Sequence, residues 1–205
     1  GAMLSSAISA IDIALWDITG KALGVPIYEL LGGVYRDTVR TYSYIYPRLD
    51  DKQRKTTSEL WMSPEPLAER AAEMRDEGFT GLKLDPVPQY SELGDPSTPW
   101  QLSLTSLDRA EKTIRLMREA VGSDCDILIG THGQMTAAAA IRLARRLEPY
   151  DPLWLEEPVP PENAREMGKV ARATRIPVAT GERLATVYDF VRVFEEGAVA
   201  IAQPD

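Results

Sequence analysis

The chain has 205 residues, of which 44% are hydrophobic and 26% charged, as is usual for a soluble globular protein. Its formal net charge of −8 argues against nucleic acid as a partner, because nucleic acid is bound by basic faces. No apolar run approaches the roughly 20 residues of a membrane span. The only cysteine, Cys125, excludes an internal disulfide and fits a reducing compartment. We therefore expect a cytoplasmic protein that binds neither nucleic acid nor membrane.

The N-terminal part is predicted to be helical. Apolar residues recur on one helical stripe over residues 4–21, and Pro26 opens a second, short helix over 27–31. We interpret residues 1–40 as a helical segment that leads to the main domain, which covers 41–205.

From residue 41 on, β-type and helical segments alternate. Strands are expected near residues 42, 82, 127, 154, 178 and 200. The helices that follow the first five of them are predicted over 66–77, 106–121, 136–147, 162–173 and 186–196. Two long polar loops, 48–63 and 87–103, interrupt the pattern, and the second is a candidate lid.

A repeating strand–helix unit predicts a parallel (β/α)8 barrel of the TIM type. Such a barrel closes with eight strands, whereas this sequence supplies about six βα units. Six strands alone would leave two open edges, which promote association. We therefore expect the chain to be a piece of a larger protein, truncated before strands 7 and 8.

Polar side chains follow four of the predicted strands. Glu156 ends one, Glu182 and Asp205 follow the next two, and His132 follows the strand before Glu156. The carboxyl ends of successive barrel strands converge on one face, where the active site of such barrels lies. These four residues are therefore candidates for a single site.

Several motifs carry a resemblance to a known family. They are the helical stretches 7–17 and 20–32, then Trp154-Leu155-Glu156-Glu157-Pro158, Gly181-Glu182 and Gln203-Pro204-Asp205. In this order they resemble the mandelate racemase/muconate lactonizing branch of the enolase superfamily, and the resemblance covers nearly the whole chain. It implies that an N-terminal capping domain and the last two barrel strands are missing, together with a histidine base on the seventh strand.

The resemblance also implies roles for single residues. Glu156 and Glu182 match two metal-ligating carboxylates, and Asp205 matches the aspartate that orients the seventh-strand histidine. Lys83 stands where the family often has the first lysine of a Lys-x-Lys pair, which implies substrate binding. His132 matches a histidine that acts as the acid in sugar-acid dehydratases of the galactonate type.

The sequence departs from the family pattern at two positions. A third metal carboxylate is expected at position 130, which is occupied by Gly130. Asp85 lies at a neighbouring strand end and could contribute instead, whereas Asp126 points the same way along the strand but is four residues deeper. Asp85 also replaces the second lysine of the pair, which counts against racemisation by two bases.

The chemistry implied by these residues is proton removal next to a carboxylate. A divalent ion stabilises the developing enediolate, and hard oxygen ligands such as Glu156 and Glu182 favour Mg²⁺ over zinc. Enolase-superfamily sites are known to combine a Lys or His base with Mg²⁺. A histidine such as His132 that protonates a leaving hydroxyl turns enolisation into dehydration. Arg183 could bind the substrate carboxylate, or equally pair with Glu157.

We therefore expect a Mg²⁺-dependent dehydratase of a small-molecule sugar acid, homo-oligomeric in its full-length form. An epimerase, racemase or cycloisomerase that uses the same enediolate is the alternative within enzymes. A non-catalytic homologue remains a further alternative, because Gly130 removes a ligand.

Overall fold

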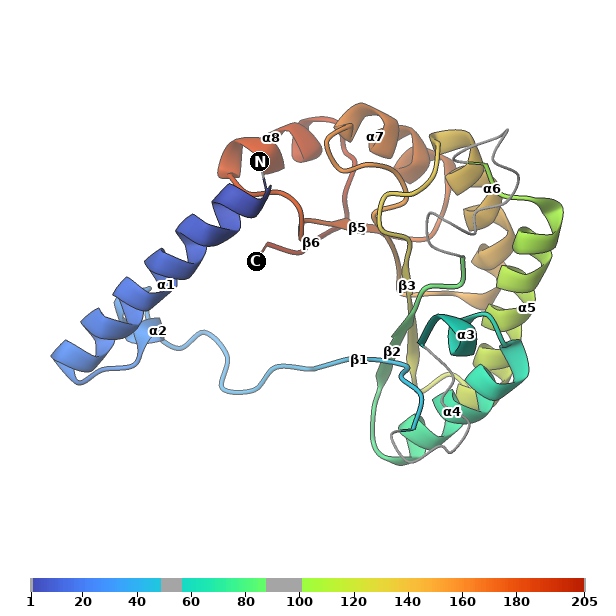
Figure 1. Cartoon of the computed structure of the whole chain (residues 1–205), viewed down its shortest axis with the longest axis horizontal. Coiled ribbons are helices and arrows are strands. Elements are labelled where there is room, and N and C mark those ends of the chain that lie inside the picture. The colour runs from blue at the N-terminus through green and yellow to red at the C-terminus, as the bar shows by residue number, and fades with distance from the viewer. Residues whose placement is uncertain (1, 49–56, 88–100, 205) are drawn as a thin grey trace.

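The structure is a computed structural model that describes residues 2–48, 57–87 and 101–204. Its centre is a six-stranded parallel sheet in the order β1-β2-β3-β4-β5-β6, as expected for successive strands of a barrel. The strands are β1 (Ser43–Tyr44), β2 (Gly81–Leu84), β3 (Asp126–Gly130), β4 (Trp154–Glu156), β5 (Val178–Thr180) and β6 (Ile201–Ala202). The predicted α/β class, with six parallel strands of a TIM-type barrel, is confirmed (Figure 1).

Helices cover the outer side of this sheet. They are α3 (Thr57–Trp61), α4 (Pro64–Asp76), α5 (Leu104–Val121), α6 (Ala137–Leu147), the 3-10 turn η1 (Glu148–Tyr150), α7 (Ala164–Ala173) and α8 (Val187–Glu195). Four begin at a side chain that accepts a backbone N–H of the first turn, which satisfies a donor that the helix itself leaves unpaired. These residues are Ser103, Thr136, Asn163 and Thr186.

Two elements differ from the sequence prediction. The strand expected from residue 41 to 46 pairs only over Ser43–Tyr44, with β2 as its one described neighbour. The predicted loop 48–63 contains α3, whose Trp61 side chain is buried and donates to the Ile45 carbonyl at 2.8 Å. The candidate lid, 87–103, lies mostly outside the described residues.

The sheet separates two apolar layers because successive side chains of a strand point to opposite faces. The larger layer packs the outward residues of the strands against the helices, with Leu82, Ile127, Ile129, Leu155 and Val178 among its fully or nearly fully buried members. The smaller one fills the inner face with Leu128, Trp154 and Ala179. The inner face therefore continues into the polar side chains at the carboxyl ends of the strands.

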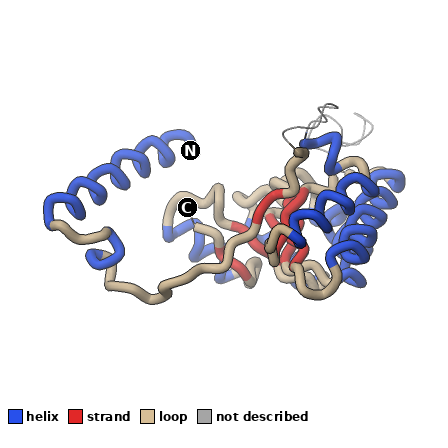
Figure 2. The backbone as a smooth tube through the Cα atoms, turned by 90° about the horizontal axis from the view of Figure 1, so that it is seen from below, coloured by secondary structure: helices blue, strands red, loops and turns tan. Residues whose placement is uncertain are grey.

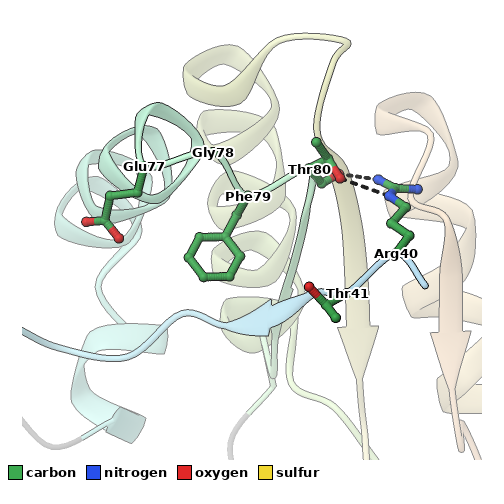
Figure 3. A pocket seen from close by; sticks show the side chains of 6 residues that line it. All are labelled: Arg40, Thr41, Glu77, Gly78, Phe79 and Thr80. Atoms are coloured by element: carbon green, nitrogen blue, oxygen red, sulfur yellow. Dashed lines mark hydrogen bonds between the residues drawn. The ribbon is translucent and has the colours of Figure 1, made fainter. Parts of the chain in front are cut away.

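Arg40 holds together the amino ends of β2 and β3. Its guanidinium donates to the hydroxyl and the carbonyl of Thr80, and one nitrogen lies 2.6 Å from Asp126 Oδ2. Figure 3 shows Arg40 reaching Thr80 at the edge of a hollow of about 240 Å³, with Phe79 on its other side. Residues at this end of a parallel barrel serve stability rather than chemistry.

The N-terminal helices lie apart from the sheet. Helix α1 (Ala2–Leu23) and the short α2 (Ile27–Leu30) form an arm that a long connection joins to β1 (Figures 1 and 2). The apolar side chains of α1 are exposed, with Ile8 at 60% and Ile11 at 65%. No helix in the described ranges is long and apolar enough to cross a membrane.

Candidate active site

Three inward positions meet at the carboxyl ends of β2, β3 and β4. Gly130 pairs in register with Glu156, and Ile129 with Leu84, so that Asp85 is the next residue along β2 and faces Gly130. One step deeper, Lys83 and Trp154 both lie in register with Leu128. The parallel register therefore gathers two carboxylates and a lysine around a position that has no side chain.

Glu156 is buried and its carboxylate is fully engaged. It is 4% exposed, and Lys83 Nζ lies 2.5 Å from its Oε1. The Trp154 indole and the Gln203 amide each donate to its Oε2 at 3.0 Å. This arrangement meets the requirement that a buried charge be paired and hydrogen-bonded.

Lys83, expected to bind substrate, is itself only 4% exposed. Besides Glu156, its ammonium group stands 4.9 Å from the centre of the Tyr44 ring, a cation–π distance. The geometry presents Lys83 as the counter-charge of Glu156, and a substrate carboxylate would have to compete for it.

The carboxylates at the strand ends together influence the pKa of a neighbouring side chain, Tyr44. The pKa of the Tyr44 hydroxyl is raised, first by burial and then by the charges of Asp85, Glu156 and Glu182. Glu182, which follows β5, is exposed and lies at the mouth of this group. Three negative side chains thus create one region of negative potential, in which a cation is stabilised.

His132 follows β3 and is directed back towards β2. Its Nδ1 lies 2.9 Å from Oδ2 of Asp85, an ion-pair contact that falls short of a well-aligned hydrogen bond. The pKa of His132 is raised, chiefly by this contact with Asp85, while burial opposes the rise. Glu182 adds to the rise and Lys83 reduces it. His132 is therefore biased towards its protonated form.

Glu157 points away from this group and is fully buried. Arg183 binds its Oε2 from two nitrogens, at 2.9 and 2.7 Å. The pKa of Glu157 is nevertheless raised, because burial outweighs the effect of Arg183. The pairing between Arg183 and Glu157, one of the two alternatives for this arginine, is thus the one present.

One residue weighed in the sequence analysis, Asp126, lies away from this group. Asp126, considered as a substitute metal ligand, lies at the amino end of β3 and pairs with Arg40. As its expected depth implies, four residues along the strand separate it from the mouth. Asp205 lies outside the described residues.

The donors at the mouth fit a hard divalent cation in chemistry. Glu156 ends β4 and Glu182 follows the neighbouring strand β5, so that both offer carboxylate oxygens, and both oxygens of buried Asp85 have no hydrogen-bond donor in the described chain. Within the described ranges, however, no three His, Cys, Asp or Glu side chains are close enough to share a metal. Mg²⁺ bound by Glu156 and Glu182 would keep several waters, and Lys83 would have to release Oε1.

Comparison with protein families gives two matches. Residues 66–205 match the model described as enolase C-terminal domain-like. Residues 1–32 match the N-terminal domain of mandelate racemase / muconate lactonizing enzyme. The first match includes every strand from β2 to β6 and the polar residues at their carboxyl ends, from Lys83 to Glu182.

Individual relatives agree with these matches. The chain is 38% identical over its whole length to a D-galactonate dehydratase of Klebsiella pneumoniae, covering 48% of that protein. It is 38% identical to a D-gluconate dehydratase of Thermoproteus tenax, with 98% of this chain and 37% of that protein covered. A mandelate racemase/muconate lactonizing enzyme-like protein from Roseovarius shares 44% identity and a TM-score of 0.89, over 100% of this chain and 50% of the other. The chain spans about half the length of the curated relatives it matches.

Proposed function

Because the chain belongs to the mandelate racemase/muconate lactonizing enzyme family of the enolase superfamily, we propose that the protein carrying it is a Mg²⁺-dependent sugar-acid dehydratase. The observation that carries the proposal is the position of His132, at the mouth and in contact with a buried aspartate that raises its pKa. Curated relatives of similar identity are dehydratases of two different sugar acids, which supports the reaction class more than the particular sugar.

Glu156 and Glu182 are the residues that we propose to hold the metal. A divalent cation there would polarise the substrate carboxylate and make the neighbouring C–H bond more acidic. Lys83, once displaced from Glu156, is placed to neutralise a carboxylate of the substrate, because its ammonium remains on the inner face next to Tyr44.

His132 is the proposed acid. Its Nδ1 is buried against Asp85, although 36% of its side chain is exposed, so that the exposed surface belongs to other atoms of the side chain. Nε2 is the second ring nitrogen and the one left to deliver a proton to the departing hydroxyl. The base that removes the α-proton to give the enediolate is proposed to be a histidine outside this chain, oriented by Asp205.

The substitution His132→Asn tests this division of labour. Dehydration should fall by about 10²-fold or more, because general acid catalysis of a leaving group contributes about that much. Exchange of the substrate α-proton with deuterated solvent should persist, since a different residue removes that proton. Both are measured by NMR on the full-length protein with galactonate and gluconate, alongside the circular dichroism of the variant as a check of folding.

Other outcomes favour the alternatives. Exchange lost from one stereoisomer only would indicate a racemase or epimerase in which His132 is a base. Turnover and exchange both absent from the unmodified protein with every sugar acid tried would indicate a non-catalytic homologue.

A further inference from the structure

Asp85 is a buried carboxylate with a single charged partner. It is 1% exposed, and its only ion pair in the described part of the chain is with His132. Neither of its oxygens accepts a hydrogen bond from any described residue. A carboxylate is costly to bury without compensation, so this position requires an explanation beyond packing.

Gly130 makes the space that Asp85 occupies. A Cβ at position 130 would overlap Oδ1 of Asp85 and lie 3.3 Å from its Cγ and from Cε of Lys83. The backbone of Gly130 does not have the positive φ that favours glycine, so no turn requires a glycine there. What residue 130 supplies is therefore room for the neighbouring carboxylate.

The backbone at His132 is arranged to meet that carboxylate. His132 has a φ of 50°, in the left-handed region that non-glycine residues seldom adopt. This conformation persists only where surrounding structure holds it, and such residues concentrate at functional sites. Here the peptide groups on either side are held, because Thr131 N–H and Gly133 N–H donate to the carbonyls of Glu156 and Glu157 at 3.2 and 2.6 Å.

We propose that Asp85 is the positioning residue of His132, and that Gly130 serves to admit the Asp85 carboxylate beside the imidazole. Asp85 holds Nδ1, stabilises the charged form of the ring and turns Nε2 towards the substrate. The aspartate thus acts through His132 and does not touch the reacting atoms. The inference rests on the proposed dehydratase function for its catalytic consequence, but the pairing itself can be measured without any turnover.

Two variants and one matched control test the pairing in the full-length protein. Asp85→Asn removes the charge at constant size, and Gly130→Ala keeps Asp85 but displaces its carboxylate. Asp126→Asn is the control, because it makes the same chemical change on the same sheet, at the opposite end of β3. The ¹⁵N NMR signals of labelled histidine, with that of His132 identified by its loss in His132→Asn, report its titration and tautomer.

We expect the titration midpoint of His132 to move to lower pH in Asp85→Asn and in Gly130→Ala, and to stay unchanged in Asp126→Asn. The direction follows because Asp85 is the largest favourable influence on the charged imidazole, while the opposing influences of burial and Lys83 remain. In the same two variants kcat for dehydration should fall about tenfold or more, with KM changed by less than about threefold.

An unchanged midpoint of His132 in Asp85→Asn would overturn the proposal. A large loss of Mg²⁺ affinity with that midpoint unchanged would overturn it as well, and would make Asp85 a metal ligand instead. If the unmodified protein dehydrates no sugar acid, the proposed function fails, whereas the NMR titration still decides whether Asp85 holds His132.

Discussion

The ion pair between Lys83 and Glu156 offers a quantitative test of the site, through the substitution Lys83→Met. The side chains are 4% and 5% exposed, and 2.5 Å separates Nζ from Oε1. Methionine keeps much of the length of the lysine side chain and removes its charge, which leaves Glu156 buried without a cation. Removing one partner of a buried ion pair costs about 3–5 kcal/mol. The indole of Trp154 and the amide of Gln203 still donate to Oε2, so we expect a value near the low end, about 3 kcal/mol.

The metal proposal adds a second, independent expectation. In a chelator-treated sample the variant should show the whole loss, because no cation then faces Glu156. With saturating Mg²⁺ the loss should be smaller, since a divalent ion bound to Glu156 replaces the missing charge and binding to the folded state stabilises it. Urea unfolding of the full-length protein under both conditions measures both numbers.

The double variant Lys83→Met/Glu156→Gln is the control. It removes both charges, so it should be closer to the unmodified protein in stability than Lys83→Met alone. A cost below about 1 kcal/mol for Lys83→Met in chelator, which is the range of solvent-exposed pairs, would refute the reasoning that this pair is buried and dry.

Two further predictions concern Mg²⁺ binding and the loss of folding stability at acidic pH. Glu156→Gln and Glu182→Gln should each weaken Mg²⁺ binding by about tenfold or more in calorimetric titration, whereas the surface variant Glu166→Gln should leave it unchanged. Unchanged affinity in both site variants would exclude Glu156 and Glu182 as ligands. Glu148 has a lowered pKa, because it accepts from the Thr174 hydroxyl and the Arg175 amide at 2.8 and 3.0 Å. Its contribution is therefore present above the ordinary glutamate value and is lost as pH falls through the lowered one. Glu148→Gln should cost less than about 1 kcal/mol near neutral pH and nothing in acid; a gap in urea stability that did not change with pH would contradict this.

Much of the fold followed from the sequence because its signals are local. Helical periods and short apolar runs predicted each strand of the sheet to within a few residues, since both report directly on which side chains are buried. The exceptions are elements whose limits depend on neighbours. The first strand is shorter than its β-type composition suggests, because β1 pairs over only two residues with β2. Helix α3 lies in a polar stretch with no helical period, and its one apolar signal was Leu60-Trp61.

The site followed from the sequence only in part, because its geometry depends on register. The spacing predicted that Glu156 ends one strand and that His132 follows the strand before it; in the structure Glu156 ends β4, and His132 follows the neighbouring strand β3. The pairing of Lys83 with Glu156 requires knowing that β2 and β4 both point these residues inward across β3. No local pattern contains that information.

Gly130 and Asp85 are best understood as one feature rather than two departures from a family pattern. Taken separately, Gly130 removes an expected metal ligand, and Asp85 replaces an expected lysine. In the structure Gly130 and Asp85 face each other across the adjacent strands β3 and β2. The Asp85 carboxylate occupies the space that a side chain at position 130 would fill. A carboxylate therefore remains at this corner of the site, attached to β2 instead of β3 and directed at His132. Because any side chain at position 130 would collide with that carboxylate, a change at either position alters the environment of the imidazole.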